Sequence, residues 1–290
     1  MGGTYLRLLL TMALWGGTFI AGRLVVQEMG AFSAAFCRFA VATLALVALT
    51  YGVEGTLPRP PKSLWGAILG LGLTGILAYN VFFFSGLKTV EAGRAALIIA
   101  LNPVAIALGA ALVFKDPLSP RKGLGIGLSL LGAGVVISGG HPWVLLRGDV
   151  GRGELLILGC VVSWMSYTLL GKRVMQELSP FAATTYACGV GALLLLGPAL
   201  GDGLLGVIPT ASPTAWASIL YLGILGSAVG FSWYYDGLRQ LGPARAGVFI
   251  NLVPVFAILL AAVMLNEIPS PALLGGGLLV ILGVVLTNSG

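Results

Sequence analysis

Two prolines stand near the middle of long apolar runs, and each has an asparagine close to it. Pro103 directly follows Asn102, and Asn251 lies three residues before Pro254. A proline within a helix removes one backbone hydrogen bond and frees the carbonyl four residues earlier. In a membrane-spanning helix, protein or a wet cavity must satisfy that carbonyl. The pattern therefore predicts a binding site with two hinges, Pro103 and Pro254, and the structural alternative is a pair of packing kinks.

Other polar and aromatic side chains near the middle of apolar runs extend this set. The predicted substrate-binding residues are Trp15, Tyr79, Asn80, Phe83, Asn102, Trp164, Tyr234 and Asn251. A buried amide needs a partner, so each asparagine contacts either another helix or a ligand. Aromatic side chains can instead be interfacial anchors, although Trp15 and Trp164 lie well inside their runs. Such a cavity is largely neutral, and it suits a neutral or zwitterionic solute with an apolar side chain rather than an organic anion.

Several kinds of chemistry lack the residues that they need. The sequence has no GxxxxGK[ST] motif to bind ATP, and neither an HExxH motif nor a histidine within an apolar run to support a hydrolase. The three cysteines have no CxxC spacing, so we expect no metal site and no cofactor. All ten acidic residues fall in connectors or at the ends of runs, which argues against a proton relay through carboxylates. We therefore expect no catalytic residues and no enzyme.

The composition is that of an integral membrane protein. Of the 290 residues, 58% are apolar and 9% are charged, and the mean hydropathy is +1.00. No water-soluble domain of this length shows such values. The formal charge of +6 is then expected on loops that face anionic lipid. The expected partners are the lipid bilayer and a small-molecule substrate, with no nucleic acid; both a monomer and a homo-oligomer fit this organisation.

Turn residues and charged connectors divide the chain into ten apolar runs of about 20 residues, the length of a membrane-spanning helix. The predicted spans are 5–26, 33–52, 64–87, 94–114, 121–139, 153–172, 180–200, 214–237, 245–265 and 272–288. The first run has Arg7 near its start and resembles a signal peptide, but it lacks an A-x-A-like exit and Trp15 interrupts it. We therefore expect an uncleaved first span.

The chain repeats itself with an offset of about 150 residues. The stretch from Arg94 to Pro120 reappears as the stretch from Arg245 to Pro271. Each half then holds five spans, which predicts two domains, residues 1–145 and 146–290. Because five is odd, the second half enters the membrane from the opposite side. The predicted fold class is all-α integral membrane, with ten transmembrane helices as two inverted five-helix repeats.

Orientation follows from the basic residues of the connectors, which favour the cytoplasmic side. One side holds ten lysines and arginines, at positions 7, 59, 62, 115, 121, 122, 172, 173, 239 and 245, and the other holds six, at 23, 38, 88, 94, 147 and 152. The difference has the same sign in each pair of equivalent connectors that we compared. Both termini are therefore expected in the cytoplasm.

These motifs resemble the EamA-type ten-span members of the drug/metabolite transporter superfamily. The resemblance rests on Leu14-Trp15-Gly16-Gly17 and Arg38-Phe39 and, in both halves, on an alanine-rich run, a mid-span proline, an acidic residue and a glycine-rich last helix. One departure is Lys115-Asp116, where the family has a glutamate; the second half keeps Glu267. Within the family, the aromatic richness of the spans is most similar to YddG-like amino-acid exporters.

The resemblance implies metabolite export across the bacterial inner membrane, with the ligand held between the halves. The expected function is an inner-membrane transporter that exports small neutral or zwitterionic metabolites, foremost amino acids including aromatic ones. It would work by alternating access without ATP hydrolysis. A multidrug or nucleoside efflux carrier is the alternative within transport, and a membrane scaffold or an intramembrane enzyme represents a different class.

Overall fold

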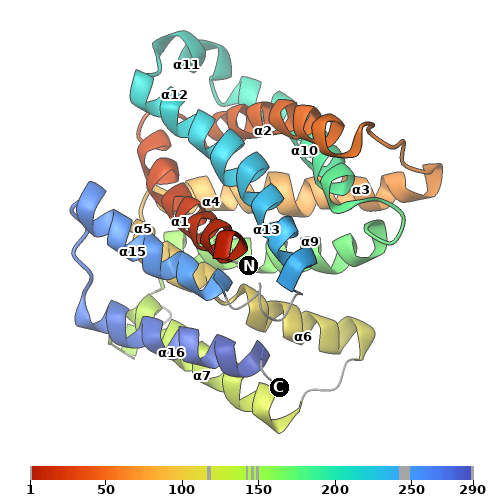
Figure 1. Ribbon diagram of the computed structural model, residues 1–290. Coiled ribbons are helices and arrows are strands. Elements are labelled where there is room, and N and C mark those ends of the chain that lie inside the picture. The colour runs from red at the N-terminus through yellow and green to blue at the C-terminus, as the bar shows by residue number, and fades with distance from the viewer. Residues whose placement is uncertain are drawn as a thin grey trace.

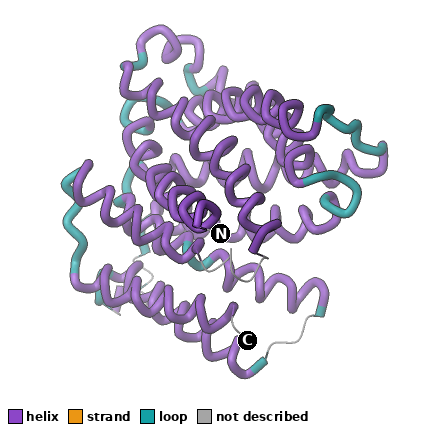
Figure 2. The backbone as a smooth tube through the Cα atoms, in the orientation of Figure 1, coloured by secondary structure: helices purple, strands orange, loops and turns teal. Residues whose placement is uncertain are grey.

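The computed structural model describes residues 2–115, 119–141, 143–144, 147, 150–241 and 249–288. Helices make up most of these residues, which contain no strand, and short loops join them (Figures 1 and 2). Within this part of the chain, nine helices are long and apolar enough to cross a membrane, and Ile250–Met264 is a shorter apolar helix. The prediction of an all-helical membrane protein is confirmed.

The first half begins with two uninterrupted helices, α1 (Gly2–Val25) and α2 (Ala31–Glu54). The third span starts with a short 3-10 turn, η1 (Lys62–Leu64), and consists of α3 (Trp65–Leu71), the π-helical segment η2 (Gly72–Ala78) and α4 (Tyr79–Leu87). The fourth span is divided into α5 (Ala92–Ile99) and α6 (Asn102–Phe114), and α7 (Pro120–Ser138) completes the half. These helices match the first five predicted spans within a few residues.

The second half follows the same order. It starts with α9 (Arg152–Val174) and α10 (Pro180–Gly201), and a short helix, α11 (Leu204–Thr210), lies in a stretch predicted as a connector. The next span consists of α12 (Pro213–Leu220), the π-helical segment η3 (Tyr221–Val229) and α13 (Gly230–Leu241). The last two are η4 (Ile250–Leu252) with α15 (Val253–Met264), and α16 (Pro271–Asn288). The start of the predicted span 245–265, with Arg245, lies outside the described residues, as does Asp116.

Serine followed by proline starts several of these helices. Ser119, Ser179 and Ser212 each take the N-cap position, and each side chain accepts a hydrogen bond from the backbone N–H three residues later, at 3.1–3.2 Å. Proline occupies the next position, where it fits because a first-turn N–H has no helical partner. The local sequence therefore fixes where these spans begin.

Both prolines singled out in the sequence lie at a break in their span. Pro103 is the second residue of α6, which begins three residues after the last residue of α5, and Pro254 is the second residue of α15, which begins directly after the 3-10 turn η4. Since proline cannot donate a backbone hydrogen bond, a new helix starts there more easily than an old one continues. Each half of the chain thus has one interrupted helix.

The helices run between two ends of the bundle. One end, called the termini end, holds the connectors 55–61 and 175–179, and the other, called the far end, holds 26–30, 88–91, 202–212 and 265–270. In Figure 1 the termini-end connectors lie to the right and the connector between α15 and α16 lies to the left. The two halves interdigitate, because α1 packs against α13 and α15 while α4 packs against α9.

Glycines set the close approach of α7 and α16, which lie side by side in Figure 1. A Cβ added at Gly132 would meet the backbone oxygen of Gly276 at 2.6 Å, and one at Gly283 would meet that of Gly125 at 2.6 Å. Only glycine permits this spacing, in the manner of small-residue seams in membranes. This closely packed pair of helices lies beside the divided helix α5–α6.

Candidate functional site

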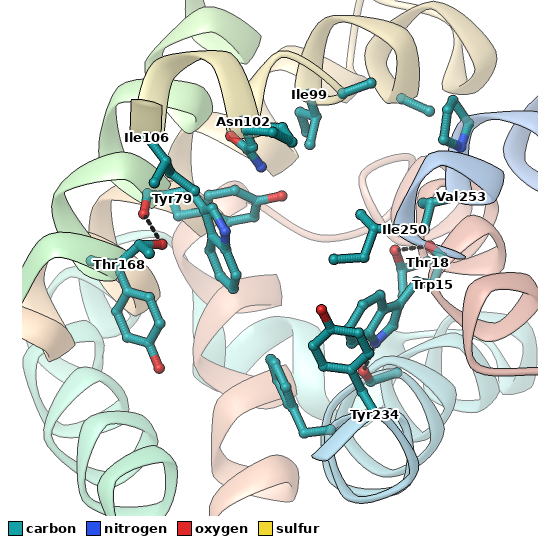
Figure 3. Close-up of a pocket in the computed structure, with 18 of the residues that line it drawn as sticks. Trp15, Thr18, Tyr79, Ile99, Asn102, Ile106, Thr168, Tyr234, Ile250 and Val253 are labelled. Atoms are coloured by element: carbon teal, nitrogen blue, oxygen red, sulfur yellow. Dashed lines mark hydrogen bonds between the residues drawn. The ribbon is translucent and has the colours of Figure 1, made fainter. Parts of the chain in front are cut away.

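A cavity of about 510 Å³ lies between the two halves of the bundle. That volume is within the usual range for small-molecule sites. Eight of the residues predicted from the sequence line it: Trp15, Tyr79, Asn102, Pro103, Trp164, Tyr234, Asn251 and Pro254. Figure 3 shows their arrangement, with Trp15, Thr18, Tyr234, Ile250 and Val253 on one side of an open space and Tyr79, Ile99, Asn102, Ile106 and Thr168 on the other. Residues far apart in the sequence therefore form one chamber.

One wall is built around Trp15 of α1. Its ring lies 5.2 Å from that of Tyr234 and 5.8 Å from that of Phe231, both on α13, and its Nε1 donates a hydrogen bond of 3.0 Å to the backbone oxygen of Gly226 in η3. A Cβ at Gly230 would lie 2.6 Å from this nitrogen. The indole is therefore held by a hydrogen bond and by the small residues in the third span of the second half. It presents a fixed apolar surface to the cavity.

The opposite wall is built in the same way around Trp164 of α9. Its ring lies 5.5 Å from Tyr79 of α4 and 5.1 Å from Tyr167, one turn further along its own helix. Trp15 and Trp164 are related by the sequence repeat. Each tryptophan therefore packs against an aromatic residue from the third span of the other half, and the chamber needs both halves.

The two π-helical segments adjoin these walls. Segment η2 directly precedes Tyr79, and η3 supplies the backbone oxygen that Trp15 binds. A π-helical turn inserts one extra residue into a helix, rotates the side chains that follow and is common at functional sites. The third span of each half therefore changes the direction of its side chains where it borders the cavity. The apolar pattern of the sequence does not indicate this change.

The two amides beside the prolines have unused polar atoms. The Oδ1 of Asn102 and the Nδ2 of Asn251 are buried and have no hydrogen-bond partner. A buried polar group without a partner costs about 1–3 kcal/mol, which a polar ligand or water in the cavity would offset. Each helix break therefore presents a polar atom that no other protein group binds.

Two predicted residues lie behind the wall rather than in it. Asn80 is 1% exposed, and its Nδ2 donates a hydrogen bond of 2.9 Å to the backbone oxygen of Ile76, in η2. Phe83 is 2% exposed and packs against Phe19 and Phe84. Both support residues that do line the cavity.

The expectation of a cavity without charge is wrong, because Arg38 lines it. Arg38 was counted among the basic residues of one membrane side and was not among the predicted site residues, although it falls within the predicted span 33–52 and is the eighth residue of α2. Its Nη1 donates a hydrogen bond of 3.0 Å to the Oδ1 of Asn80. The guanidinium is tolerated inside a spanning helix because it faces this amide and the cavity rather than lipid.

The cavity extends toward the termini end. Its lining includes Gly171 and Met175 at the end of α9 and Thr184 near the start of α10, and Met175 is 46% exposed. Toward the far end, the side chains that follow the chamber are fully buried, among them Phe84 and Leu87. The structure is therefore closed at the far end and open toward the termini end.

Carboxylates from one half cover helix starts of the other half at the far end. Asp202 accepts hydrogen bonds from the backbone N–H groups of Phe32 and Ser33 at 3.0 and 3.1 Å, since the N-cap residue of α2, Gly30, has no side chain to do so. A Cβ at Gly30 would collide with this carboxylate. Contacts of this type satisfy free N–H groups and are favoured by the helix dipole.

Two more contacts repeat this arrangement at the far end. Glu267 accepts a hydrogen bond of 2.8 Å from the backbone N–H of Ala92, which opens α5, and lies 3.4 Å from Arg23. Glu28 accepts hydrogen bonds from the backbone N–H and the hydroxyl of Ser212 at 2.7 and 2.6 Å. Burial raises the pKa of Glu267, and the bonds from Ser212 lower the pKa of the exposed Glu28.

Sequence reasoning missed several lining residues. Besides Arg38, these include Thr18, Tyr167, Thr168 and Phe231. Tyr167 lies one helical turn after Trp164, so the spacing could have indicated it. In the described part of the chain, no group of three or more histidine, cysteine, aspartate or glutamate side chains could hold a metal ion.

Known proteins resemble this chain over nearly its whole length. Residues 3–138 and 151–289 each match the EamA-like transporter family. A protein of Archaeoglobus fulgidus named "Uncharacterized transporter" is 32% identical over 286 residues, which cover 99% of this chain and 97% of the relative. A protein of Streptantibioticus cattleyicolor named "Probable terminal-alkyne amino-acid exporter" is 33% identical over 292 residues, which cover 97% of this chain and 92% of the relative.

A solved crystal structure shares the fold. It is 22% identical in sequence, and the alignment has a TM-score of 0.63 and covers 99% of this chain and 97% of that chain. At this identity the likeness concerns the fold alone. The relatives above are named as transporters, and this agrees with the expectation that the chain is no enzyme.

Proposed function

Because the chain belongs to the EamA-like transporter family and is therefore a membrane transporter, we propose that it exports small neutral or zwitterionic metabolites, foremost amino acids with apolar or aromatic side chains. The observation that carries this proposal is the chamber between the halves, with an aromatic pair on each wall and unpartnered amides at both helix breaks. Aromatic walls suit an apolar side chain, and the polar atoms suit the charged end of an amino acid.

The similarity to an amino-acid exporter supports this choice. The Streptantibioticus relative is named for an amino-acid substrate, and the alignment covers nearly the whole of both chains. A multidrug carrier remains the competing function, since an aromatic chamber also accepts flat apolar cations. The positive charge of Arg38 in the chamber wall argues against it.

We further propose that the two halves are inverted repeats in the bacterial inner membrane, with both termini in the cytoplasm. The basic connectors support this orientation, and because Arg38 lies inside α2, it no longer counts among the basic residues of the far end, which leaves that end still fewer. The cavity would then be open to the cytoplasm, which is the state in which an exporter loads its solute. Asn102 and Asn251 lie at the helix breaks, where transporters of this architecture hold their ligands.

Transport by this route needs the two ends to open in turn. Pro103 and Pro254 are placed to act as hinges, because each stands where a span is already interrupted. In the described chain, the carboxylates that form ion pairs or hydrogen bonds lie at the two ends of the bundle, in contact with arginines, serines or helix starts. We therefore propose facilitated transport down the gradient of the solute, without ATP hydrolysis.

Flux into proteoliposomes that contain only this protein tests the function. We expect uptake of aromatic amino acids from a panel that also includes nucleosides and cationic drugs, and a changed preference among solutes in Trp15→Ala and Trp164→Ala. Trp15→Phe and Trp164→Phe serve as matched controls, because they keep an aromatic face. If the protein transports cationic drugs but no amino acid, the proposed substrate class is wrong. Accumulation of a solute driven by an imposed pH difference alone would overturn the facilitated mechanism.

A further inference from the structure

Arg38 is a cation within a chamber that contains no other charged side chain among its described lining residues. It is the eighth residue of α2, so its Cα lies roughly 10 Å from the start of a helix that crosses a hydrocarbon layer of about 30 Å. Arginine stays protonated under all physiological conditions. The chamber therefore carries a permanent positive charge.

This charge has no counterion in the described part of the chain. The three ion pairs there involve Arg7, Arg23 and Arg94. The Arg38 guanidinium donates a hydrogen bond to Asn80 and lies 5.1 Å from the centre of the Phe39 ring. Its Nε is buried and has no hydrogen-bond partner. A guanidinium offers five N–H donors, so most of its binding capacity is unused.

The neighbours of Arg38 orient it without neutralising it. Asn80 is held by its own helix, because its Nδ2 binds the backbone oxygen of Ile76 and leaves Oδ1 for the Nη1 of Arg38. If the role of Arg38 were only to join α2 to α4, a neutral hydrogen-bond donor could do the same without the cost of burying a charge. A buried cation that lacks a partner is costly, and an anionic ligand removes that cost when it binds.

We propose that Arg38 binds the carboxylate of the transported solute and so makes a carboxylate a requirement for binding. The proposal rests on the transport function proposed above and narrows its substrate class to monocarboxylates such as amino acids. One guanidinium balances a single negative charge, so nucleotide sugars and other phosphates would leave excess charge in the chamber. Cationic drugs are repelled by the same group, although the aromatic walls would otherwise accept them.

Direct binding to the purified protein in nanodiscs tests this role separately from transport. The probes are L-phenylalanine, 3-phenylpropionate, L-phenylalaninamide and phenethylamine, which share a phenyl ring and differ in the carboxylate. We expect the wild type to bind the two acids at least about tenfold more tightly than the amide and the amine, a difference of about 1.4 kcal/mol. Arg38→Gln should lose this preference, and Arg38→Lys should keep part of it because the charge remains but the planar fork is lost.

Two further measurements distinguish a ligand-binding role of Arg38 from a purely structural one. The unfolding temperature of Arg38→Gln without ligand should equal or exceed that of the wild type, since the change removes an unpaired charge. Asn80→Asp leaves Arg38 in place but supplies an internal carboxylate, and it should also abolish the preference for acids. The proposal is overturned if Arg38→Gln and the wild type discriminate acids from amides equally, or if the wild type binds no carboxylate probe. Carboxylate binding that depends on Arg38, without flux of any amino acid, would instead contradict the transport function.

Discussion

The two ends of the bundle use related sequence positions, but they are closed to different degrees. At the far end, Asp202, Glu267 and Glu28 each bind the start of a helix from the other half. At the termini end, Glu54, which precedes Asp202 by 148 residues, accepts a hydrogen bond of 2.9 Å from Ser179, the N-cap residue of α10. This is the equivalent of the Asp202 contact.

The other two contacts have no such equivalent among the described residues. Glu177, which follows Glu28 by 149 residues, is exposed. Asp116, which precedes Glu267 by 151 residues, lies outside the described part of the chain. The three far-end carboxylates each join the two halves on the side where the cavity is closed, so they stabilise that closure. Transport by the proposed alternating access would then require the far-end contacts to break.

Reversing one charge at each end is the strongest way to test this difference. Arg23 and Glu267 have side chains that are 26% and 13% exposed, whereas Arg7 and Asp236 are 55% and 24% exposed. Arg23→Glu places two carboxylates together in a partly buried site, so it should favour opening of the far end by about 1–3 kcal/mol, between the values for exposed and buried pairs. Arg7→Glu should have an effect below about 1 kcal/mol.

Distances between spin labels report on this opening. Labels at Leu205 and Ile268, which are 72% and 87% exposed at the far end, should move apart in Arg23→Glu, and labels at Val53 and Val113 near the termini end should not. The three native cysteines, all buried, are replaced by alanine in this background. Equal responses to Arg23→Glu and Arg7→Glu would show that the contacts at the two ends are equivalent.

The paired prolines give a second, smaller test. If both ends open in turn, both interrupted helices must flex, and Pro103→Ala and Pro254→Ala should each lower the transport rate severalfold. Alanine lets the helix continue through the break and restores its hydrogen bond, so folding should be preserved. Flux is measured per amount of folded protein, with unfolding temperature as the control. Flux that falls only in proportion to lost folded protein would identify packing kinks.

Much of the fold follows from the sequence because the membrane imposes simple rules. Long apolar runs must form helices, and Ser-Pro pairs mark where several of them begin. The repeat relates Trp15 to Trp164, and depth within their runs was enough to suggest that both contribute to the site. Pro103 and Pro254 could likewise be located, because proline acts on its own helix.

The missed features depend on contacts between distant segments. Arg38 lies inside the predicted span 33–52 but was counted only among the charges of one membrane side, because hydropathy cannot reveal that Asn80, in another helix, faces it. The partners of the far-end carboxylates are equally remote, since Asp202 and Phe32 are 170 residues apart. The π-helical segments, η2 and η3, depend on single extra residues that apolar sequences do not mark. Local patterns thus predicted the spans, and three-dimensional contacts determined the charge of the site.

The smallest expected effect concerns pH and the far end alone. Burial raises the pKa of Glu267 above its ordinary value, although the N–H of Ala92 and the charge of Arg23 oppose this. A carboxyl group with a raised pKa binds a proton more tightly in the closed end than in water. It therefore contributes to closure fully below its ordinary pKa of 4.5, and that contribution is lost as the pH rises through the raised pKa. Acidification from neutral pH should favour the closed far end.

Spin-label distances between positions 205 and 268 should therefore shift modestly toward the closed value as the pH falls toward 4.5, and the pair at 53 and 113 should not follow the same curve. Glu267→Gln is the matched variant, because it keeps an oxygen that can accept from Ala92 but has no carboxyl group to titrate. Its distances should not depend on pH over this range. Opening of the far end on acidification would mean that the ion pair with Arg23 outweighs the burial of Glu267. In that case the carboxylate would stabilise closure only while it is charged, and Glu267→Gln would open the far end at neutral pH.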